Sequence, residues 1–442
     1  MGDGQMDEKV RKATLNYSIK DGVAWSVSNA LGSSYIAPYA LALGASNVQI
    51  GLLTSVPTLA ANLSEVRTPK LMERIRRKRI VTICALAQAL MLLPIAFVAL
   101  LFPIVGAKSL IAPMLVIILY TVYLVILSFS EPAWSSWIGD LVPEQERGRF
   151  FGNRNAILGV ASISAMLLGG IFLNILTPGQ ALSGFVALFI MAAITELVSW
   201  NFLRKEYEPR FKYKDEFYFT FSSFVRRMKG NNFGRFTIYV TLIVFAVSIA
   251  NPFFAVYLLR ELKFSYIVYV SIILSSPITQ VIGMRYWGKF SDRYGNLLLL
   301  RICGMLVPVT PILLLVSPSP IYLFGVQALS GVLWSGFNLA SSNYIYDCVT
   351  KQRLGICFSY FGALNGVGVF FGATLGSLIA TYVNVGFMSI LLFLFLVSGI
   401  LRLVFSLVML PKLREVRTVE APKPLWYHVG GIVRKRPPLH PH

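Results

Sequence analysis

Residues 111–139 read IAPMLVIILYTVYLVILSFSEPAWSSWIG, a long apolar run whose one charged residue is Glu131. An α-helix needs about 20 apolar residues to cross the hydrocarbon core of a bilayer. Comparable runs recur along almost the whole chain of 442 residues, of which 56% are hydrophobic and only 14% charged. A soluble protein carries about 25% charged residues. The sequence therefore predicts a polytopic α-helical membrane protein.

The apolar runs predict an all-α integral membrane fold with twelve transmembrane helices. The longest connection on the basic side, residues 204–235, is rich in Lys and Arg and lies near the middle of the chain. We expect it to link two six-helix bundles, 21–203 and 236–410, with an N-terminal segment at 1–20 and a basic tail at 411–442. The twelve predicted spans are 21–44, 48–68, 79–103, 111–139, 154–176, 182–203, 236–259, 265–287, 297–316, 320–346, 356–382 and 386–410.

The distribution of charge predicts the orientation of the chain. Of the 40 Lys and Arg residues, only Lys108, Arg260 and Lys263 fall in the loops that the spans place outside. Because cytoplasmic loops are enriched in Lys and Arg, both termini should be cytoplasmic, as in a multi-pass plasma membrane protein. The net charge of +20 is spread over short loops. This argues against a nucleic acid partner and favours contact with anionic lipid headgroups.

The residues that build metal sites and many catalytic centres are scarce. The four cysteines have no metal-ligand spacing, and the chain has only three histidines. No cluster of His, Asp and Glu and no nucleophile motif supports a membrane-embedded enzyme. We therefore expect no metal, no cofactor and no catalytic residue.

The two halves of the sequence repeat one another. A shift of 207 residues places Asp140 on Asp347 and Glu131 on Asn338. A second alignment places Pro69–Arg74 on Gly288–Arg293. Internal repeats of this kind are typical of secondary transporters.

The loop Gly288–Gly295, GKFSDRYG, resembles the inner-loop signature of the major facilitator superfamily. The equivalent first-half loop is a degraded version, in which Glu73 stands where the family has Asp. Residues 140–152 also resemble the family's loop between the fourth and fifth spans. The resemblance covers about residues 15–410. It implies two six-helix bundles around a central cavity, a permease that works by alternating access.

The resemblance also implies a cytoplasmic gate. A carboxylate can accept hydrogen bonds from the free N–H groups at the start of a facing helix. Asp292 would face the fifth span near Gly152, and Glu73 the eleventh near Gly355, only while the inner side is closed. The alternative is a plain turn with cytoplasmic charges. The predicted gate residues are Glu73, Arg74, Asp140, Gly288, Asp292, Arg293, Gly295 and Asp347.

In this fold the first, fourth, seventh and tenth spans line the cavity. Polar residues that share a helical face on these spans should point inward, because polar groups are costly against lipid. None of them is Lys or Arg, which disfavours phosphate-bearing solutes and favours a small neutral or cationic organic solute. The predicted cavity residues are Trp25, Asn29, Ser33, Tyr120, Ser128, Ser135, Ser248, Asn251, Gln327, Trp334, Ser335, Asn338 and Ser342.

Glu131 is the predicted site of proton coupling, because its apolar span contains no Lys or Arg. A carboxylate buried without a partner takes up a proton more readily, as a proton carrier requires. Glu131 could instead balance a cationic substrate or be structural. Glu196 lies in the sixth span, which is usually peripheral in this fold, and we expect it to be structural. We expect Arg402 to extend to the headgroups.

The sequence thus predicts a monomeric secondary transporter of the cytoplasmic membrane. It would move a small neutral or cationic organic solute by alternating access, coupled to protons. One alternative is an uncoupled facilitator of the same fold. Another, from a different class, is a transport-inactive membrane receptor or scaffold.

Overall fold

The computed structural model describes residues 8–101, 110–209, 221–350 and 353–416. The predicted N-terminal segment, central linker and basic tail fall partly outside these ranges, and Lys108 does so entirely. The described residues form helices and no strands. Ten helical segments among them are long and apolar enough to span a membrane. The two remaining predicted spans correspond to α1–α2 and α3, which carry more polar residues, so the prediction of an all-α twelve-span fold is confirmed.

The first half consists of six spans, three of them built from more than one helical piece. Its helices are α1 (Glu8–Leu31), η1 (Ser33–Tyr35), α2 (Ile36–Ala42), α3 (Asn47–Glu65), α4 (Thr68–Arg74), α5 (Arg77–Phe97), η2 (Val98–Leu101), α7 (Ile111–Leu141), α8 (Glu144–Ile175), η3 (Pro178–Gln180) and α9 (Ala181–Leu203).

The second half repeats this order after a short connecting helix. Its helices are α10 (Phe221–Arg227), η4 (Met228–Gly230), α11 (Asn232–Ala250), α12 (Phe253–Val256), the π-helix η5 (Tyr257–Glu261), α13 (Tyr266–Tyr294), α14 (Asn296–Leu306), α15 (Val309–Leu313), α16 (Pro320–Cys348), α17 (Leu354–Tyr382), α18 (Ile390–Met409) and η7 (Leu410–Lys412).

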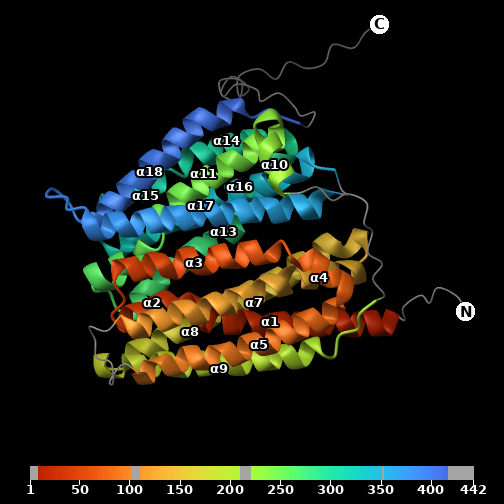
Figure 1. Ribbon diagram of the computed structural model, residues 1–442, viewed down its shortest axis with the longest axis horizontal. Helices are drawn as coiled ribbons and strands as arrows, with labels where there is room; N and C mark the ends of the chain where they lie inside the picture. The colour runs from red at the N-terminus through yellow and green to blue at the C-terminus, as the bar shows by residue number, and fades with distance from the viewer. Residues whose placement is uncertain (1–7, 102–109, 210–220, 351–352, 417–442) are drawn as a thin grey trace, which may run out of the picture.

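The two halves lie side by side as two bundles (Figure 1). Helices α1–α9 form the lower bundle of the view and α11–α18 the upper one. The bundles pack against each other through α3 with α17 and through α8 with α13. We call the end at which α1 begins and α18 ends the terminal side, and the other end the opposite side.

The repeat is visible in how each half anchors its third span. In the first half, Arg77 at the start of α5 donates to the Asp140 carboxylate at 2.6 Å. In the second half, Asn296 at the start of α14 donates to Asp347, also at 2.6 Å. The residues that the 207-residue shift pairs thus do the same structural work. Because both aspartates bind within their own half, neither bridges the halves through these contacts.

A second pair of carboxylates secures the same two helix starts. Glu208 accepts a hydrogen bond from the backbone N–H of Lys78 at 3.3 Å. Glu415, again 207 residues later, accepts one from the N–H of Leu297 at 3.1 Å. Unpaired N–H groups at a helix start favour a negative partner. The segments after α9 and α18 are therefore fastened to the bundles in the same way.

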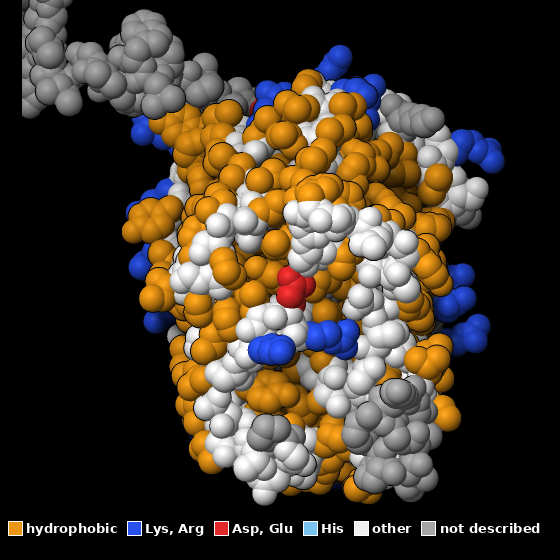
Figure 2. Space-filling view, turned by 90° about the vertical axis from the view of Figure 1, so that its left-hand side faces the viewer, with side chains coloured by type: hydrophobic (Ala, Val, Ile, Leu, Met, Phe, Trp, Pro, Cys, Tyr) orange, Lys and Arg blue, Asp and Glu red, His pale blue; other side chains and the backbone are white. Residues whose placement is uncertain are grey.

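The halves are closed against each other on the opposite side. Asn47 of α3 donates to the Ala380 carbonyl of α17 at 3.2 Å. Arg260 donates to the Ala45 carbonyl at 2.5 Å. The rings of Phe185 and Tyr266 also meet across the halves, with centroids 5.6 Å apart. Figure 2 views this face and shows an acidic group with basic groups beside it near the centre, surrounded mainly by apolar and neutral groups.

The terminal side does not make the predicted gate contacts. Asp292 is exposed and has no hydrogen bond or ion pair with the described residues. A Cβ added at Gly152, near the start of the facing α8, would meet nothing within 4 Å. The described residues therefore do not form the predicted contact between Asp292 and the start of α8. The gate stays a prediction.

Candidate functional site

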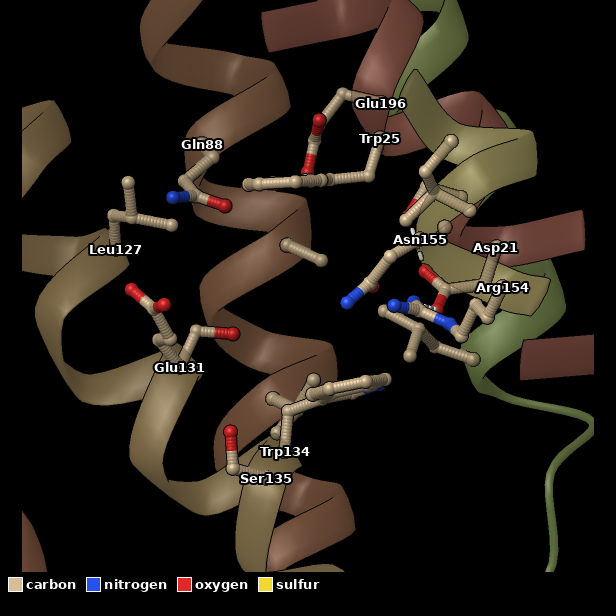
Figure 3. A pocket seen from close by; sticks show the side chains of 17 residues that line it. Asp21, Trp25, Gln88, Leu127, Glu131, Trp134, Ser135, Arg154, Asn155 and Glu196 are labelled. Atoms are coloured by element: carbon tan, nitrogen blue, oxygen red, sulfur yellow. Dashed lines mark hydrogen bonds and ion pairs between the residues drawn. The ribbon is translucent and has the colours of Figure 1, made fainter. Parts of the chain in front are cut away.

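A cavity of about 250 Å³ lies inside the first half, between α1, α5, α7, α8 and α9 (Figure 3). Apolar side chains such as Val81, Leu127 and Leu158 form part of its wall. Its polar and aromatic lining is Asp21, Trp25, Gln88, Ser130, Glu131, Trp134, Ser135, Arg154, Asn155, Glu196 and Ser199. Apolar walls with a few convergent polar groups are typical of small-molecule sites.

One wall of the cavity carries a buried ion pair. Arg154 of α8 lies 3.7 Å from the Asp21 carboxylate of α1. Its Nε donates to the Ser18 carbonyl at 3.1 Å, and the Ser199 hydroxyl donates to Asp21 at 2.7 Å. The guanidinium also stacks over the Trp134 ring, 4.2 Å from its centroid. Asp21 and Arg154 therefore balance each other's charge.

Glu206, which follows α9, lies near this pair on the terminal side. Its side chain is buried, and its carboxyl oxygens have no hydrogen-bond partner among the described residues. Burial raises the pKa of the Glu206 carboxyl to about 9, and the nearby Asp21 adds to this shift. Arg154 and Lys78 lower the pKa by a smaller amount. Glu206 is therefore neutral around pH 7.

Glu196 of α9 points into the cavity toward Trp25 (Figure 3). It is 1% exposed, and neither carboxyl oxygen has a hydrogen-bond partner in the described part of the chain. A charged carboxylate in such a place is costly unless it gains a proton or a cation. The sixth span is not peripheral here, because α9 packs with α1 and α5 around the cavity. The expectation that Glu196 is structural stays a prediction.

Glu131 lines the same cavity from α7, on the wall across from Arg154 (Figure 3). It is exposed rather than buried, and it has no hydrogen bond or ion pair with the described residues. The expected burial of Glu131 is therefore wrong in this conformation, because an apolar span that faces an open cavity is wet on that face. Its placement in the cavity agrees with the prediction.

A second, smaller cavity of about 90 Å³ lies inside the other half, between α11, α15, α16 and α18. Arg402 of α18 lines it and is only 6% exposed. The expectation that Arg402 reaches the headgroups is wrong. Its side chain points into the bundle, since α18 packs this face against α11 and α15. The other polar lining is Asn251, Thr310, Gln327, Ser330 and Trp334.

The predicted cavity residues divide between these cavities and other places. Trp25, Glu131 and Ser135 line the first cavity. Asn251, Gln327 and Trp334 line the second. The predicted residues that line neither are Asn29, Ser33, Tyr120, Ser128, Ser248, Ser335, Asn338 and Ser342.

Three of these serines are buried at helix contacts. Ser128 and Ser335 return hydrogen bonds to carbonyls of their own helices, at 2.8 Å and 2.7 Å. Ser335 also packs against Gly283 of α13, and Ser248 packs against Gly372 of α17. A small hydroxyl that satisfies itself locally fits a close helix crossing. Periodicity alone does not separate this use of serine from a cavity lining.

Sequence reasoning missed seven polar or aromatic residues of the first cavity: Asp21, Gln88, Ser130, Trp134, Arg154, Asn155 and Ser199. Asp21 and Arg154 fall at the ends of predicted spans, where charges commonly face headgroups. Their opposite signs were the available signal for a pair. The premise that the lining lacks Lys and Arg is wrong, since Arg154 and Arg402 each line a cavity.

The predicted gate residues lie on the terminal side, in one group for each half. Glu73, Arg74, Asp292 and Arg293 are exposed, and Arg293 lies over the ring of Tyr294 at 5.2 Å. Gly288 lies on the last part of α13. Gly295 has a positive φ of 89°, which lets the chain turn directly from α13 into α14. The carboxylates of Asp140 and Asp347 already accept hydrogen bonds from Arg77 and Asn296, respectively.

The fold is shared with solved transporters of low sequence identity. A D-xylose-proton symporter matches at a TM-score of 0.72 and 12% identity, covering 92% of this chain and 99% of that one. A mutant of the nucleoside transporter NupG matches at 0.69 and 15%, covering 90% and 100%. The xylose transporter XylE from E. coli, in a partially occluded inward open conformation, matches at 0.66 and 11%, covering 94% and 100%.

No curated protein matches the chain in sequence. The family model described as Major Facilitator Superfamily matches residues 22–234 and 236–439, which is nearly the whole chain. This agrees with the 6+6 arrangement and with the signature at 288–295. This family and these structural relatives indicate a transporter and not an enzyme. The chain belongs to the Major Facilitator Superfamily.

Proposed function

We propose that this chain is a proton-coupled secondary transporter that moves a small neutral or cationic organic solute by alternating access. One observation carries the proposal. The first-half cavity contains three carboxyl groups and one arginine, and that arginine already balances Asp21. Glu131 and Glu196 are left without a counter-ion among the described residues. A proton or a cationic group can fill that role.

The two free carboxyls have complementary access to water. Glu131 is exposed in the cavity, on the side that the solution reaches. Glu196 is buried deeper and favours the protonated form or a bound cation. Protonation removes negative charge from the cavity, so it changes the affinity for any solute that binds there. Such a change of affinity is what couples a proton gradient to transport.

Alternating access is supported by the contacts between the halves. On the opposite side, Asn47 and Arg260 hold them together. On the terminal side, Asp292 and Glu73 are exposed and available for the reverse closure. The two bundles would rock about α3–α17 and α8–α13, exposing the cavities to each side in turn.

The distribution of charged residues supports an orientation of the chain in the membrane. The centre of the opposite face carries an acidic group with basic groups beside it (Figure 2). Most Lys and Arg residues lie in the loops of the terminal side, such as Arg74, Arg76 and Arg79 near the turn from α4 to α5. We propose that the chain is a plasma membrane monomer, with the terminal side in the cytoplasm near anionic headgroups.

The test is transport by purified protein in proteoliposomes. A panel of small organic cations and neutral solutes is first screened by thermal shift, because a ligand of the folded state raises the melting temperature. A hit is then assayed for uptake with and without an imposed pH gradient. Accumulation that requires the gradient supports the proposal. Uptake that merely equilibrates, whatever the gradient, would establish the uncoupled facilitator instead.

A further inference from the structure

Arg402 is a buried cation without a counter-ion in the part of the chain that the structure describes. Its side chain is 6% exposed and lines the second-half cavity. No described residue forms a hydrogen bond or ion pair with it, and its buried Nε has no hydrogen-bond partner. A guanidinium cannot escape burial by losing its proton, because arginine stays charged in proteins. The side chain therefore requires an anion.

The wall around Arg402 supplies neutral hydrogen-bond donors and no acid. Gln327, Ser330 and Trp334 of α16 lie on one side, and Asn251 of α11 on another. Asn251 is exposed, so the cavity is reached from that residue. A fork of N–H groups flanked by amide and hydroxyl donors matches a planar carboxylate, which accepts two parallel hydrogen bonds.

The size of the cavity limits what enters it. About 90 Å³ is far below the roughly 300–1,000 Å³ of a site that encloses a whole drug-sized ligand. It has room for one small group. The chemistry and the volume together fit a carboxylate at the end of a larger molecule better than a phosphate-rich anion.

Arg402 lies at a level along the sixth span of its half similar to that of Glu196 in the first half, although the 207-residue shift pairs Glu196 with Leu403. Arg402 lies seven residues before the end of α18, at Met409, and Glu196 lies seven before the end of α9, at Leu203. The sixth span of each half thus carries one buried ionisable group that has no counter-ion among the described residues, at a similar level, acidic in one half and basic in the other. A purely structural role explains neither, since apolar residues pack such positions without charge.

We infer that the second half contains a carboxylate-binding site centred on Arg402, and that its occupant is the carboxylate of the transported solute. The solute would then carry a cationic group for the first half and a carboxylate for the second. Its net charge stays neutral, as a zwitterion. The identity of the occupant rests on the proposed transport function, whereas the site itself does not.

The experiment is a thermal-shift titration of the full-length chain in detergent with three probes: sodium butyrate, its neutral isostere butyramide, and sodium chloride. We expect butyrate to raise the melting temperature in a saturable way and the other two to leave it unchanged. Arg402→Gln should weaken the apparent butyrate affinity by at least about tenfold, the loss expected for hydrogen bonds to a charged group. Arg402→Lys, which keeps the charge without the fork, should bind with intermediate affinity.

The matched control is Arg285→Gln, which removes an exposed arginine of α13 outside both cavities and should bind like the wild type. Equal shifts with butyrate and butyramide, or no shift with butyrate, would overturn the site. So would an unchanged butyrate affinity in Arg402→Gln. A shift with sodium chloride that competes with butyrate would assign the site to an inorganic anion and overturn the carboxylate. Loss of proton coupling in a transport assay would leave the butyrate result unaffected, so the two proposals fail separately.

Discussion

The two halves of this chain share one architecture and differ in the charge they bury. The first half encloses a cavity of about 250 Å³ with three carboxyl groups and one arginine, and the second a cavity of about 90 Å³ with a single arginine and no acid in its lining. Their outer framework is nearly symmetric, with Asp140 and Asp347 anchoring equivalent helix starts. The repeat has therefore kept what holds each bundle together and diverged where a solute would bind.

The largest expected effect concerns proton coupling by the carboxyl groups in the cavity of the first half. A gradient of one pH unit is worth about 1.4 kcal/mol per proton, or roughly tenfold accumulation. Glu131→Gln should reduce that ratio to about one while downhill exchange continues, because the neutral amide can neither take up nor release a proton. Glu196→Gln should do the same if the buried carboxyl shares the proton. The measurement is uptake of a screened solute into proteoliposomes with and without the gradient.

The control for these variants is Glu146→Gln, which changes a carboxylate that is 58% exposed and pairs with Arg11 on the surface. It should accumulate solute like the wild type. If both cavity variants still accumulate solute with an unchanged response to pH, the carboxyls of the first half are structural and the charge difference between the halves has another purpose.

The second effect concerns stability. Arg154→Met leaves Asp21 buried without its partner, and breaking a buried ion pair costs about 3–5 kcal/mol. Arg402→Met removes a charge that has no partner among the described residues, so it should leave stability unchanged or increase it. In detergent, the melting temperature of Arg154→Met should fall, whereas that of Arg402→Met should stay the same or rise. Equal losses in both would mean that Arg402 has a hidden counter-ion in the ligand-free protein.

Most of the fold was predictable from the sequence, because each span carries its own signal. Length, hydropathy and the spacing of basic loops indicate twelve helices, and the shift of 207 residues correctly pairs Asp140 with Asp347. These are local properties or simple repeats of them. They do not depend on how helices turn about their axes.

The candidate site was only partly predictable, since it depends on that rotation. Trp25, Glu131 and Ser135 were found because each lies on a polar face of its span. Asp21 and Arg154 were missed because they meet only when α1 and α8 pack together. Arg402 was misplaced because an arginine near a span end can turn toward headgroups or into the bundle, and only packing decides.

A third effect compares the two signature loops. Asp292 belongs to the intact version and Glu73 to the degraded one, and both are exposed in this conformation. If they close the terminal side by binding helix starts, Asp292→Asn should destabilise the closed state by about 1–2 kcal/mol. Glu73→Gln should destabilise the closed state by a smaller amount. The rate at which a reagent labels Ser135→Cys, in the exposed part of the cavity, reports opening. Unchanged labelling in a folded Asp292→Asn variant would show that the loop is only a turn and not a gate.

The smallest effect tests the segments that fasten each half. Glu206 is buried after α9 with a pKa of about 9, while Glu415 lies half-buried after α18 and accepts a hydrogen bond from Leu297. A free glutamate has a pKa of about 4.3, so between about pH 5 and pH 9 the folded chain holds a proton at Glu206 that the unfolded chain has released. Stability must then fall as pH rises through this window, with the loss complete above the folded pKa.

Glu206→Gln carries a permanently neutral group and should therefore flatten the decline of melting temperature between about pH 6 and pH 9. The change should amount to a few degrees, because Lys78 and Arg154 partly stabilise the charged form. Glu415→Gln is the matched variant in the other half and should lower the melting temperature, since it weakens the hydrogen bond that the Glu415 carboxylate accepts from the backbone N–H of Leu297. If the slope persists in Glu206→Gln, the pH dependence arises from groups inside the cavity, and the asymmetry between the halves does not extend to the segments that fasten them.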